Sequence, residues 1–408
     1  MGKARQPVAD VAIVGRGVTG HVLAAALAHA SGGGLDIAVL DREAGSTPGA
    51  ERALALSRGA VTMLGAIGIW PSIAPQARAM ERIIVTDGRP GASQLSLLEF
   101  AGEGAGGPSA HVVDEGDLAR AVAGAAGRAP GVRFIADGVA GFSPGAGAAM
   151  LELESGGGLA ARLVVAADGA RSAVRQSAGI TTVGWSYGQS ALVARVAHER
   201  DHHGVALERF LPAGPFAVLP LRGRNSSLVW TELNARADEL VAAGREEVLA
   251  ALAERWDEER GAIGRLGRLA AFALRFHVAR RFVAPRLALV GDAAHQVHPL
   301  AGQGLNLGLR DVAALTEVVV DTLRLGLDPG APPPIERYER WRRFDTVSSA
   351  LAYDGLNRLF SNDRGAVRLI RDLGLGLVDR LPALKRAFMT EAAGGTGAVP
   401  KLMAGEAV

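Results

Sequence analysis

Apolar runs and Ala/Leu-rich stretches alternate along much of the chain. Four short runs of β-branched or apolar residues predict strands, and each is followed by a glycine or an acid: Val11–Val14, Ile37–Leu40, Leu163–Ala167 and Leu287–Val290. Helical stretches follow such runs, as Val22–Ala30 follows the first. This alternation predicts an α/β fold with a largely parallel sheet.

The middle of the chain has a different pattern. Short strand candidates such as Phe216–Leu219 and Ser227–Thr231 predict a separate β-sheet domain. Two glycine-rich segments, Ala101–Pro108 and Gly141–Gly147, predict loops or hairpin turns. Pro332–Pro334 precedes a C-terminal part that we expect to be helical.

Composition indicates a globular protein, because 49% of the 408 residues are hydrophobic and 21% are charged. No run of eighteen apolar residues is present to span a membrane, and the polar segment Met1–Asp10 does not resemble a signal peptide, so we expect a soluble cytoplasmic protein. The sequence contains no Cys, which excludes disulfides, thiolate metal sites, iron–sulfur clusters and a cysteine nucleophile. A formal net charge of +2 predicts no nucleic-acid partner.

A glycine-rich turn follows the first predicted strand. Gly15, Gly17 and Gly20 form a GxGxxG pattern between this strand and a helix. The first glycine permits a tight turn, the second lets a pyrophosphate approach the backbone, and the third lets helix and strand pack closely. Asp41 follows the second strand, where an acid can accept both hydroxyls of an adenosine ribose. The pattern predicts a dinucleotide site and leaves both NAD and FAD open.

A second glycine-rich site favours FAD. Gly291 and Asp292 follow the strand Leu287–Val290, and a loop then opens a helix whose apolar positions recur at helical spacing from Leu305 onward. An acid at a strand end can hold a polyol hydroxyl, and a helix N-terminus stabilises the negative charge of a reduced flavin. NAD has no ribityl chain and gives no reason for a second site, so the two sites together predict FAD.

Three ordered motifs resemble those of a known family. Residues 291–306 are similar to the GD motif of the group A flavin monooxygenases, which have a hydroxybenzoate-hydroxylase-like fold, and residues 168–175 are similar to their DG motif. Residues 298–311 narrow the resemblance to the UbiH/UbiF/VisC hydroxylases of ubiquinone biosynthesis. Further segments that carry this resemblance are 52–57, 188–191, 208–221, 229–232 and 354–361.

The resemblance implies a Rossmann-like FAD-binding domain with an inserted β-sheet substrate domain and a helical C-terminal tail. We expect the FAD-binding domain to comprise residues 1–77, 108–180 and 276–345. The substrate domain would then comprise residues 78–107 and 181–275, and the tail residues 346–408.

The resemblance also implies roles for individual residues. Arg52 would reach FAD, Asp292 would hold the ribityl chain, and Pro299, Gly302 and Gln303 would form the catalytic environment of the flavin ring. The other implied cofactor contacts, beyond the first glycine turn and its acid, are Asp168, Gly169, Gly291, Gly302, Gly304, Leu305 and Asn306.

One departure concerns the helix after residue 112, where many relatives carry an Arg against the FAD phosphates. This chain is acidic there, so either Arg120 substitutes from the next turn or that contact is missing. His295 is expected to be structural, residues 202–203 to lie in a surface loop, and no metal site is predicted. Arg171 and Arg175 would meet either NAD(P)H or the FAD side of the fold.

The activity implied by the resemblance is aromatic hydroxylation. NAD(P)H would reduce FAD, O₂ would add at flavin C4a, and the hydroperoxide would hydroxylate a polyprenylated phenol or quinol. Phe216 and Trp230 would either sandwich this substrate or belong to ordinary sheet packing, and no residue identifies itself as a general base. Three alternatives stay open: a hydroxylase of another aromatic, an FAD-dependent prenyl reductase, and a non-enzymatic scaffold that retains FAD.

The tail from Gly355 to Met389 is basic and amphipathic. Such a segment can lie on the inner membrane, contact a ubiquinone-biosynthesis complex, or pack on the FAD domain, and we favour packing within the protein or on a partner. The sequence leaves open the ring position that is hydroxylated, the choice of NADH or NADPH, the prenyl length and the oligomeric state.

Overall fold

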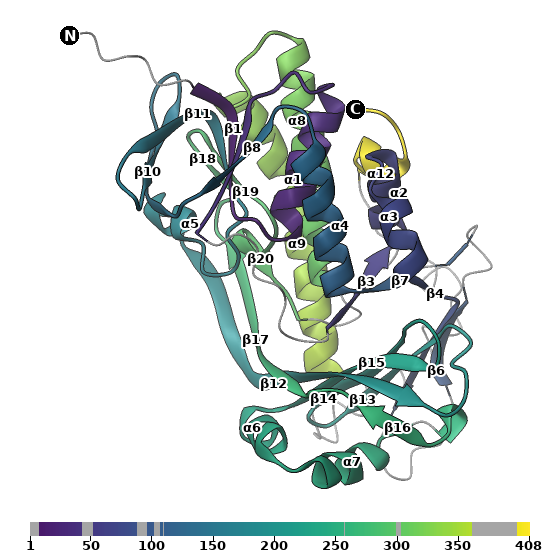
Figure 1. Ribbon diagram of the computed structural model, residues 1–408. Coiled ribbons are helices and arrows are strands. Elements are labelled where there is room, and N and C mark those ends of the chain that lie inside the picture. Colours follow the sequence, from purple (N-terminus) through teal and green to yellow (C-terminus); the bar gives the residue numbers. More distant parts are fainter. Residues whose placement is uncertain are drawn as a thin grey trace.

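The polypeptide forms two layers of sheet and helix (Figure 1). The structure is a computed structural model that describes residues 8–42, 52–87, 96–101, 107–108, 110–256, 258–298, 303–360 and 398–408. Within these ranges, no helix is long and apolar enough to cross a membrane.

The upper layer in Figure 1 contains a sheet with strand order β18-β19-β11-β1-β2-β8, extended by the β9–β10 hairpin. Its strands are β1 (Val8–Val14), β2 (Ile37–Asp41), β8 (Val132–Ala136), β9 (Val139–Ser143), β10 (Ala149–Leu153), β11 (Gly158–Ala166), β18 (Val283–Ala284) and β19 (Leu287–Leu289). The pairs β8–β2, β2–β1, β1–β11 and β11–β19 are parallel. The four strands expected from apolar runs are β1, β2, β11 and β19, so the predicted largely parallel sheet is confirmed. The predicted turn at Gly141–Gly147 lies in the β9–β10 hairpin.

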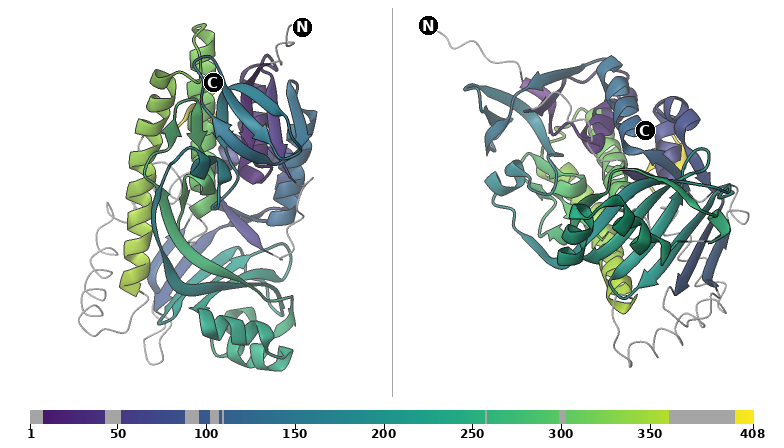
Figure 2. Two further views of the ribbon diagram at one scale, coloured as in Figure 1. Left: turned by 90° about the vertical axis from the view of Figure 1, so that its left-hand side faces the viewer. Right: turned by 60° about the horizontal axis from the view of Figure 1, so that its bottom comes forward.

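Helices cover this sheet. The main helices are α1 (Val18–Ala30), α4 (Glu115–Arg128), α8 (Gln303–Arg324) and α9 (Pro332–Phe360). Helix α1 packs between α4 and α8, and its segment from Gly20 to Ala28 is buried on all sides, which explains its Ala-rich composition. Helix α9 packs along α8 on the outside of the molecule (Figure 2).

The lower layer is a mostly antiparallel sheet with order β20-β17-β12-β15-β14-β13-β5-β6. Its strands are β5 (Arg82–Asp87), β6 (Ser96–Ala101), β12 (Thr182–His198), β13 (Val205–Leu211), β14 (Gly214–Pro220), β15 (Asn225–Leu233), β16 (Ile263–Leu266, beside β12), β17 (Ala270–Ala279) and β20 (His295–Gln296). One pair, β5–β13, is parallel. The expected strands Phe216–Leu219 and Ser227–Thr231 lie within β14 and β15. The long strands β12 and β17 run from one layer into the other (Figure 1).

The two faces of this lower sheet have different neighbours. One face packs against α6 (Asn234–Ala242) and α7 (Arg245–Ala253) through a cluster that includes Leu207, Phe216 and Trp230. Both aromatic rings are therefore in ordinary sheet packing, which was one of the two alternatives for them. Because side chains alternate along a strand, the residues between them face the upper layer.

Smaller elements join the two layers. They are β3 (Ala53–Ser57), β4 (Arg78–Met80), β7 (Ala110–Asp114), α2 (Arg58–Ala66), α3 (Trp70–Ile73), α5 (Ala173–Ser177), α12 (Lys401–Ala404) and the 3₁₀ turns Ala74–Gln76, Glu258–Arg260 and Gly291–Ala293. Strands β3, β7 and β4 form a third sheet in that order. The expected helical C-terminal part is seen in α9 and α12. Most of the Gly355–Met389 tail and of the Ala101–Pro108 segment lies outside the described residues, and the domain boundaries stay a prediction.

Candidate functional site

The first glycine turn connects β1 to α1 in a tightly packed corner. Gly15 has φ +114°, and a Cβ atom there would stand 2.3 Å from the carbonyl oxygen of Ala167. A Cβ atom on Gly20 would stand 2.1 Å from the oxygen of Gly15. By contrast, nothing lies within 4 Å of the corresponding position on Gly17. Only the middle glycine therefore faces open space at the helix N-terminus, which is where a pyrophosphate would lie.

Asp41, at the end of β2, is hydrogen-bonded to this turn. Its Oδ2 accepts a hydrogen bond of 2.9 Å from the backbone N–H of Arg16. The Arg16 guanidinium lies over the Phe134 ring, 4.8 Å from its centroid. The acid is therefore beside the turn, as its sequence position predicts, and its contact with a ribose stays a prediction.

The DG motif lies against the first glycine turn, because a Cβ atom on Gly15 would stand 2.8 Å from the backbone nitrogen of Asp168. The Asp168 carboxylate accepts hydrogen bonds from the backbone N–H groups of Ala173 (2.8 Å) and Val174 (3.4 Å), and burial raises its pKa although Ser172 opposes the shift. Gly169 has φ +79° and lies beside it. Arg175 donates to the carbonyl oxygen of Ala293, 2.8 Å away in the GD motif. The DG motif therefore contacts both glycine-rich sites, and the Arg175 side chain is engaged in the hydrogen bond to Ala293.

The GD motif turns sharply after β19. Gly291 has φ +57°, and its N–H donates to Asp311 Oδ2 at 3.0 Å. The Asp292 carboxyl group is open to a cavity although protein surrounds it, and burial raises its pKa against the opposing effects of His295 and Arg52. Asp292 is thus an acid at a strand end that faces free space, as the predicted contact to a polyol requires.

Helix α8 begins at the same cavity. Gln303, Gly304 and Leu305 line it, and nothing lies within 4 Å of a Cβ position on Gly304. Asn306 also lines it, but its side chain is committed to β3: Oδ1 accepts from Ser57 N–H and Nδ2 donates to the Ala55 carbonyl, each at 2.9 Å. Any flavin contact of Asn306 would therefore come from its backbone. Pro299 and Gly302 lie outside the described residues.

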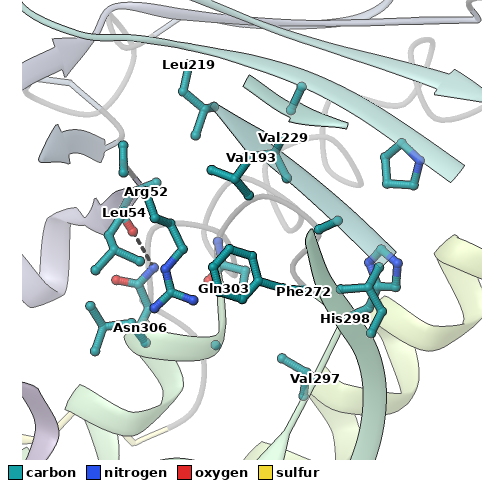
Figure 3. Close-up of a pocket in the computed structure, with 18 of the residues that line it drawn as sticks. Arg52, Leu54, Val193, Leu219, Val229, Phe272, Val297, His298, Gln303 and Asn306 are labelled. Atoms are coloured by element: carbon teal, nitrogen blue, oxygen red, sulfur yellow. Dashed lines mark hydrogen bonds between the residues drawn. The ribbon is translucent and has the colours of Figure 1, made fainter. Parts of the chain in front are cut away.

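Arg52 enters the cavity from the start of β3 (Figure 3). Its guanidinium forms a two-pronged ion pair with Glu115, with Nε–Oε2 at 2.8 Å, and lies 5.6 Å from the centroid of the Phe272 ring. In Figure 3 the Phe272 ring projects into the middle of the cavity, between Arg52 on one side and His298 on the other. Arg120 is exposed and pairs with Asp117 on α4, so it does not point toward this cavity.

The cavity extends from the GD motif and Thr19, next to the first glycine turn, to the lower sheet. Its volume is about 570 Å³. On the sheet side its lining is mostly small and apolar, and Figure 3 shows Val193, Leu219 and Val229 on that side. Further lining residues from the lower sheet are Ile83, Ala191, Ala206, Glu208, Pro215, Ala217, Thr231, Ala271 and Ala273. One continuous space therefore connects the GD motif and the start of α8 to an apolar surface.

A buried ionic network supports the GD motif from behind. His295 Nε2 lies 2.6 Å from Asp311 Oδ2, and Arg342 Nε donates to Asp311 Oδ1 at 2.8 Å. Burial acts to raise the pKa of Asp311, but the charges of His295 and Arg342 lower it on balance. His295 is structural, as expected. The pairing of Asp311 with Arg342 was not predicted from the sequence, because 31 positions separate the two residues.

Three other histidines differ in their surroundings. His298 lines the cavity, and neither ring nitrogen finds a hydrogen-bond partner in the described part of the chain. Burial lowers the pKa of His298 to about 4, with Asp354 opposing, and its ring meets that of Tyr187 edge-on. His202 and His203 lie in the loop between β12 and β13, as predicted, but only His203 is at the surface, because His202 is buried and bonds the Leu221 carbonyl.

Comparisons with known proteins agree with this geometry. Residues 8–327 match the family described as FAD binding domain. The chain is 43% identical to ubiquinone hydroxylase UbiL of Rhodospirillum rubrum over 95% of this chain and 90% of that protein. It is 31% identical to the mitochondrial ubiquinone biosynthesis monooxygenase COQ6 of Rattus norvegicus, covering 94% and 90% of the two chains. Among solved structures, p-nitrophenol 4-monooxygenase PnpA of Pseudomonas putida superposes with a TM-score of 0.78 at 21% identity, over 96% of this chain and 99% of that one, and so shares the fold.

The predicted hydroxybenzoate-hydroxylase-like fold and the FAD cofactor are thereby confirmed. The chain belongs to the FAD-dependent monooxygenase family, in the group of the ubiquinone-biosynthesis hydroxylases.

Proposed function

We propose that this protein uses NAD(P)H and O₂ to add one hydroxyl group to the ring of a polyprenylated phenol in ubiquinone biosynthesis. The observation that carries the proposal is the continuity of the cavity, which runs from Asp292 and the start of α8 to the apolar face of the lower sheet. The names of the relatives, ubiquinone hydroxylase and ubiquinone biosynthesis monooxygenase, support the choice of substrate.

The residues present fit FAD. The open space over Gly17 suits a pyrophosphate, Asp41 lies where a ribose would follow, and Asp292 faces the cavity as a ribityl contact would. Gly304 leaves the N-terminus of α8 open toward the same space, so its amides can stabilise negative charge on the flavin ring. Bound FAD would supply the redox chemistry by accepting a hydride from NAD(P)H and activating O₂.

The chain's own task is to position the ring and exclude water. Small side chains such as Ala217, Val229 and Val193 give a flat apolar surface on which an aromatic ring can lie. We expect Phe272, which projects into the cavity beside Arg52, to restrict water near the flavin ring (Figure 3). The reaction then balances: the phenol, NAD(P)H, O₂ and a proton yield the hydroxylated phenol, NAD(P)⁺ and water.

The test is an absorbance spectrum of the purified protein, followed by NAD(P)H oxidation under ¹⁸O₂ with and without 2-prenylphenol. A flavin spectrum and one labelled oxygen in the product are expected. Oxidation of NAD(P)H without label would point instead to a prenyl reductase or an uncoupled oxidase. Label that enters small soluble phenols as readily as prenylated ones would indicate a hydroxylase of another aromatic.

The predicted contact of the C-terminal tail with a membrane surface or a partner complex stays part of this proposal. It falls on residues outside the described ranges. Binding of the full chain to vesicles of anionic lipid, measured by co-sedimentation, would test the membrane alternative.

A further inference from the structure

A single carboxyl group lies in the apolar floor of the cavity. Along β13, Leu207 points into the core between the lower sheet and α6–α7, so its neighbour Glu208 points the other way, into the cavity. Only 9% of Glu208 is exposed. No aspartate, lysine or arginine shares its position on the adjoining strands.

The register of the sheet shows how apolar these surroundings are. Glu208 pairs with Val85 on β5 and with Ala217 on β14, and the same row continues through Val229 on β15 to Val193 on β12. Among the described residues, no hydrogen bond or ion pair reaches the Glu208 carboxyl group. Burial alone raises its pKa to about 7.

The other charged groups that face this space lie on different elements. The cavity is also lined by Arg52, Arg275, Asp292 and His298. On the sheet face itself, Arg195 follows Val193 by two positions, and its guanidinium is paired with Asp114 at 2.9 Å. None of these charged groups contributes to the pKa shift of Glu208. The protonation of Glu208 therefore responds to the ligand in the cavity rather than to a fixed partner.

A buried carboxyl group without a partner destabilises a fold, since desolvation opposes its charged form. An alanine or valine in the row would avoid that cost. A group that is unpaired in the protein but open to a ligand cavity is instead available to a hydrogen-bond donor on the ligand. In a phenol that donor is the ring hydroxyl.

We propose that Glu208 accepts the proton of the substrate's phenolic hydroxyl. The inference rests on the proposed function, because it requires a phenol in the cavity. The phenolic O–H bond breaks, the proton forms an O–H bond with the Glu208 carboxylate, and the electron pair stays on the ring oxygen. The resulting phenolate is a stronger carbon nucleophile at the ring positions that are hydroxylated. The proton returns to solvent when the product leaves.

His298 is another titratable group in the cavity, and its ring nitrogens have no hydrogen-bond partner in the described residues. Its pKa of about 4 makes it a much weaker base than Glu208. A base works best when its pKa lies near the working pH, and Glu208 meets that condition.

The first test measures binding rather than turnover. Oxidised holoenzyme without NAD(P)H is titrated with 2-prenylphenol and with its methyl ether, which has no proton to donate, and the perturbation of flavin absorbance gives each Kd. At pH 8 the wild-type protein should prefer the phenol by about tenfold, because a hydroxyl that donates to a carboxylate forms a strong hydrogen bond. This preference should shrink as the pH falls below about 7. Glu208→Gln should show a smaller preference that does not change between pH 6 and pH 8.

Glu239→Gln is the matched control, since this glutamate is exposed on α6 in the same layer. It should retain the wild-type preference and pH dependence. A Glu208→Gln protein with the same phenol preference and the same pH dependence as wild type would overturn the assignment of Glu208.

Turnover separates this inference from the proposed function. With ¹⁸O₂ and 2-prenylphenol, kcat/KM of Glu208→Gln should fall on the order of 10²-fold at pH 7 and recover toward high pH, where the phenol ionises unaided. If the wild-type protein incorporates ¹⁸O and Glu208→Gln does so equally well at pH 7, the proton acceptor is wrong and the function stands. If the wild-type protein neither binds nor labels the phenol, the proposed function fails, and this inference fails with it.

Discussion

Two sets of buried polar groups beside the cavity differ in how their side chains are paired. Behind the GD motif, Asp311 is bonded to His295, Arg342 and the backbone of Gly291. On the cavity side of the lower sheet, by contrast, Thr231 Oγ1 is buried without a hydrogen-bond partner in the described residues, as are both ring nitrogens of His298. The bonds of Asp311 hold the backbone of the GD motif, whereas Thr231 and His298 line the cavity and are open to a ligand there.

The strongest test of this distinction is Asp311→Ala. It leaves the guanidinium of Arg342, which is 0% exposed, with only part of its ion pairing. Removing one partner of a buried ion pair costs about 3–5 kcal/mol of unfolding free energy. Urea denaturation should show that loss together with reduced FAD occupancy, because Gly291 loses its acceptor. Asp321→Asn, a partly exposed acid on the same helix, should change the unfolding free energy by less than about 1 kcal/mol. A stable, fully yellow Asp311→Ala protein would show that the network is dispensable.

Neighbouring residues on β15 test the two faces of the lower sheet. Trp230 is 1% exposed in the core against α6 and α7, and Val229 lines the cavity. Trp230→Ala should cost about 3–4 kcal/mol of unfolding free energy. Val229→Ala should cost about 1 kcal/mol and change chiefly the Kd of 2-prenylphenol. Equal losses of stability from both substitutions would contradict the assignment of the faces.

The pH dependence of stability should separate Glu208 from His298, because their pKa shifts have opposite signs. Between pH 7 and 4.5 the folded protein holds a proton on Glu208 that the unfolded chain lacks, so this group adds stability as the pH falls. Between pH 6.5 and 4 the unfolded chain holds a proton that folded His298 lacks, so this group removes stability as the pH falls. Each contributes about 3 kcal/mol over its range.

The two contributions oppose each other in the wild-type protein. Relative to wild type, Glu208→Gln should therefore become progressively less stable on acidification from pH 7 to pH 4.5. His298→Gln should become progressively more stable from pH 6.5 to pH 4. Unfolding free energies from urea titrations across this range provide the measurement. Curves that run parallel to the wild-type curve for both variants would show that neither group has the shifted pKa.

The two layers also differ in how far the sequence predicts them. The glycine turn was predictable because a Cβ atom on Gly15 or Gly20 would collide with backbone oxygens, so both positions require glycine. This requirement produces a fixed spacing of glycines in the sequence. The position of Glu208 in the cavity was not predictable, because apolar residues occupy both faces of β13. The alternation of side chains does not show which face is open to a cavity. The ionic network around Asp311 and the hydrogen bond between Asn306 and Ser57 join residues that are far apart in the sequence. No local sequence pattern connects such residues.

The smallest expected effect compares two glycines of one turn. Gly20→Ala places a Cβ atom 2.1 Å from the Gly15 oxygen, so the backbone must shift, at a cost of about 1–3 kcal/mol even in the protein without FAD. Gly17→Ala adds a methyl group to open space, so the unfolding free energy of the FAD-free protein should change by less than about 0.5 kcal/mol. Its methyl group would nevertheless occupy the approach of a pyrophosphate, and FAD affinity should fall on the order of tenfold. Thermal unfolding of the FAD-free proteins and fluorescence titration with FAD measure the two quantities separately. Unchanged FAD affinity in Gly17→Ala would mean that the cofactor phosphates do not lie against this turn. A lower stability of the FAD-free Gly17→Ala protein would mean that the protein itself already fills the space over Gly17.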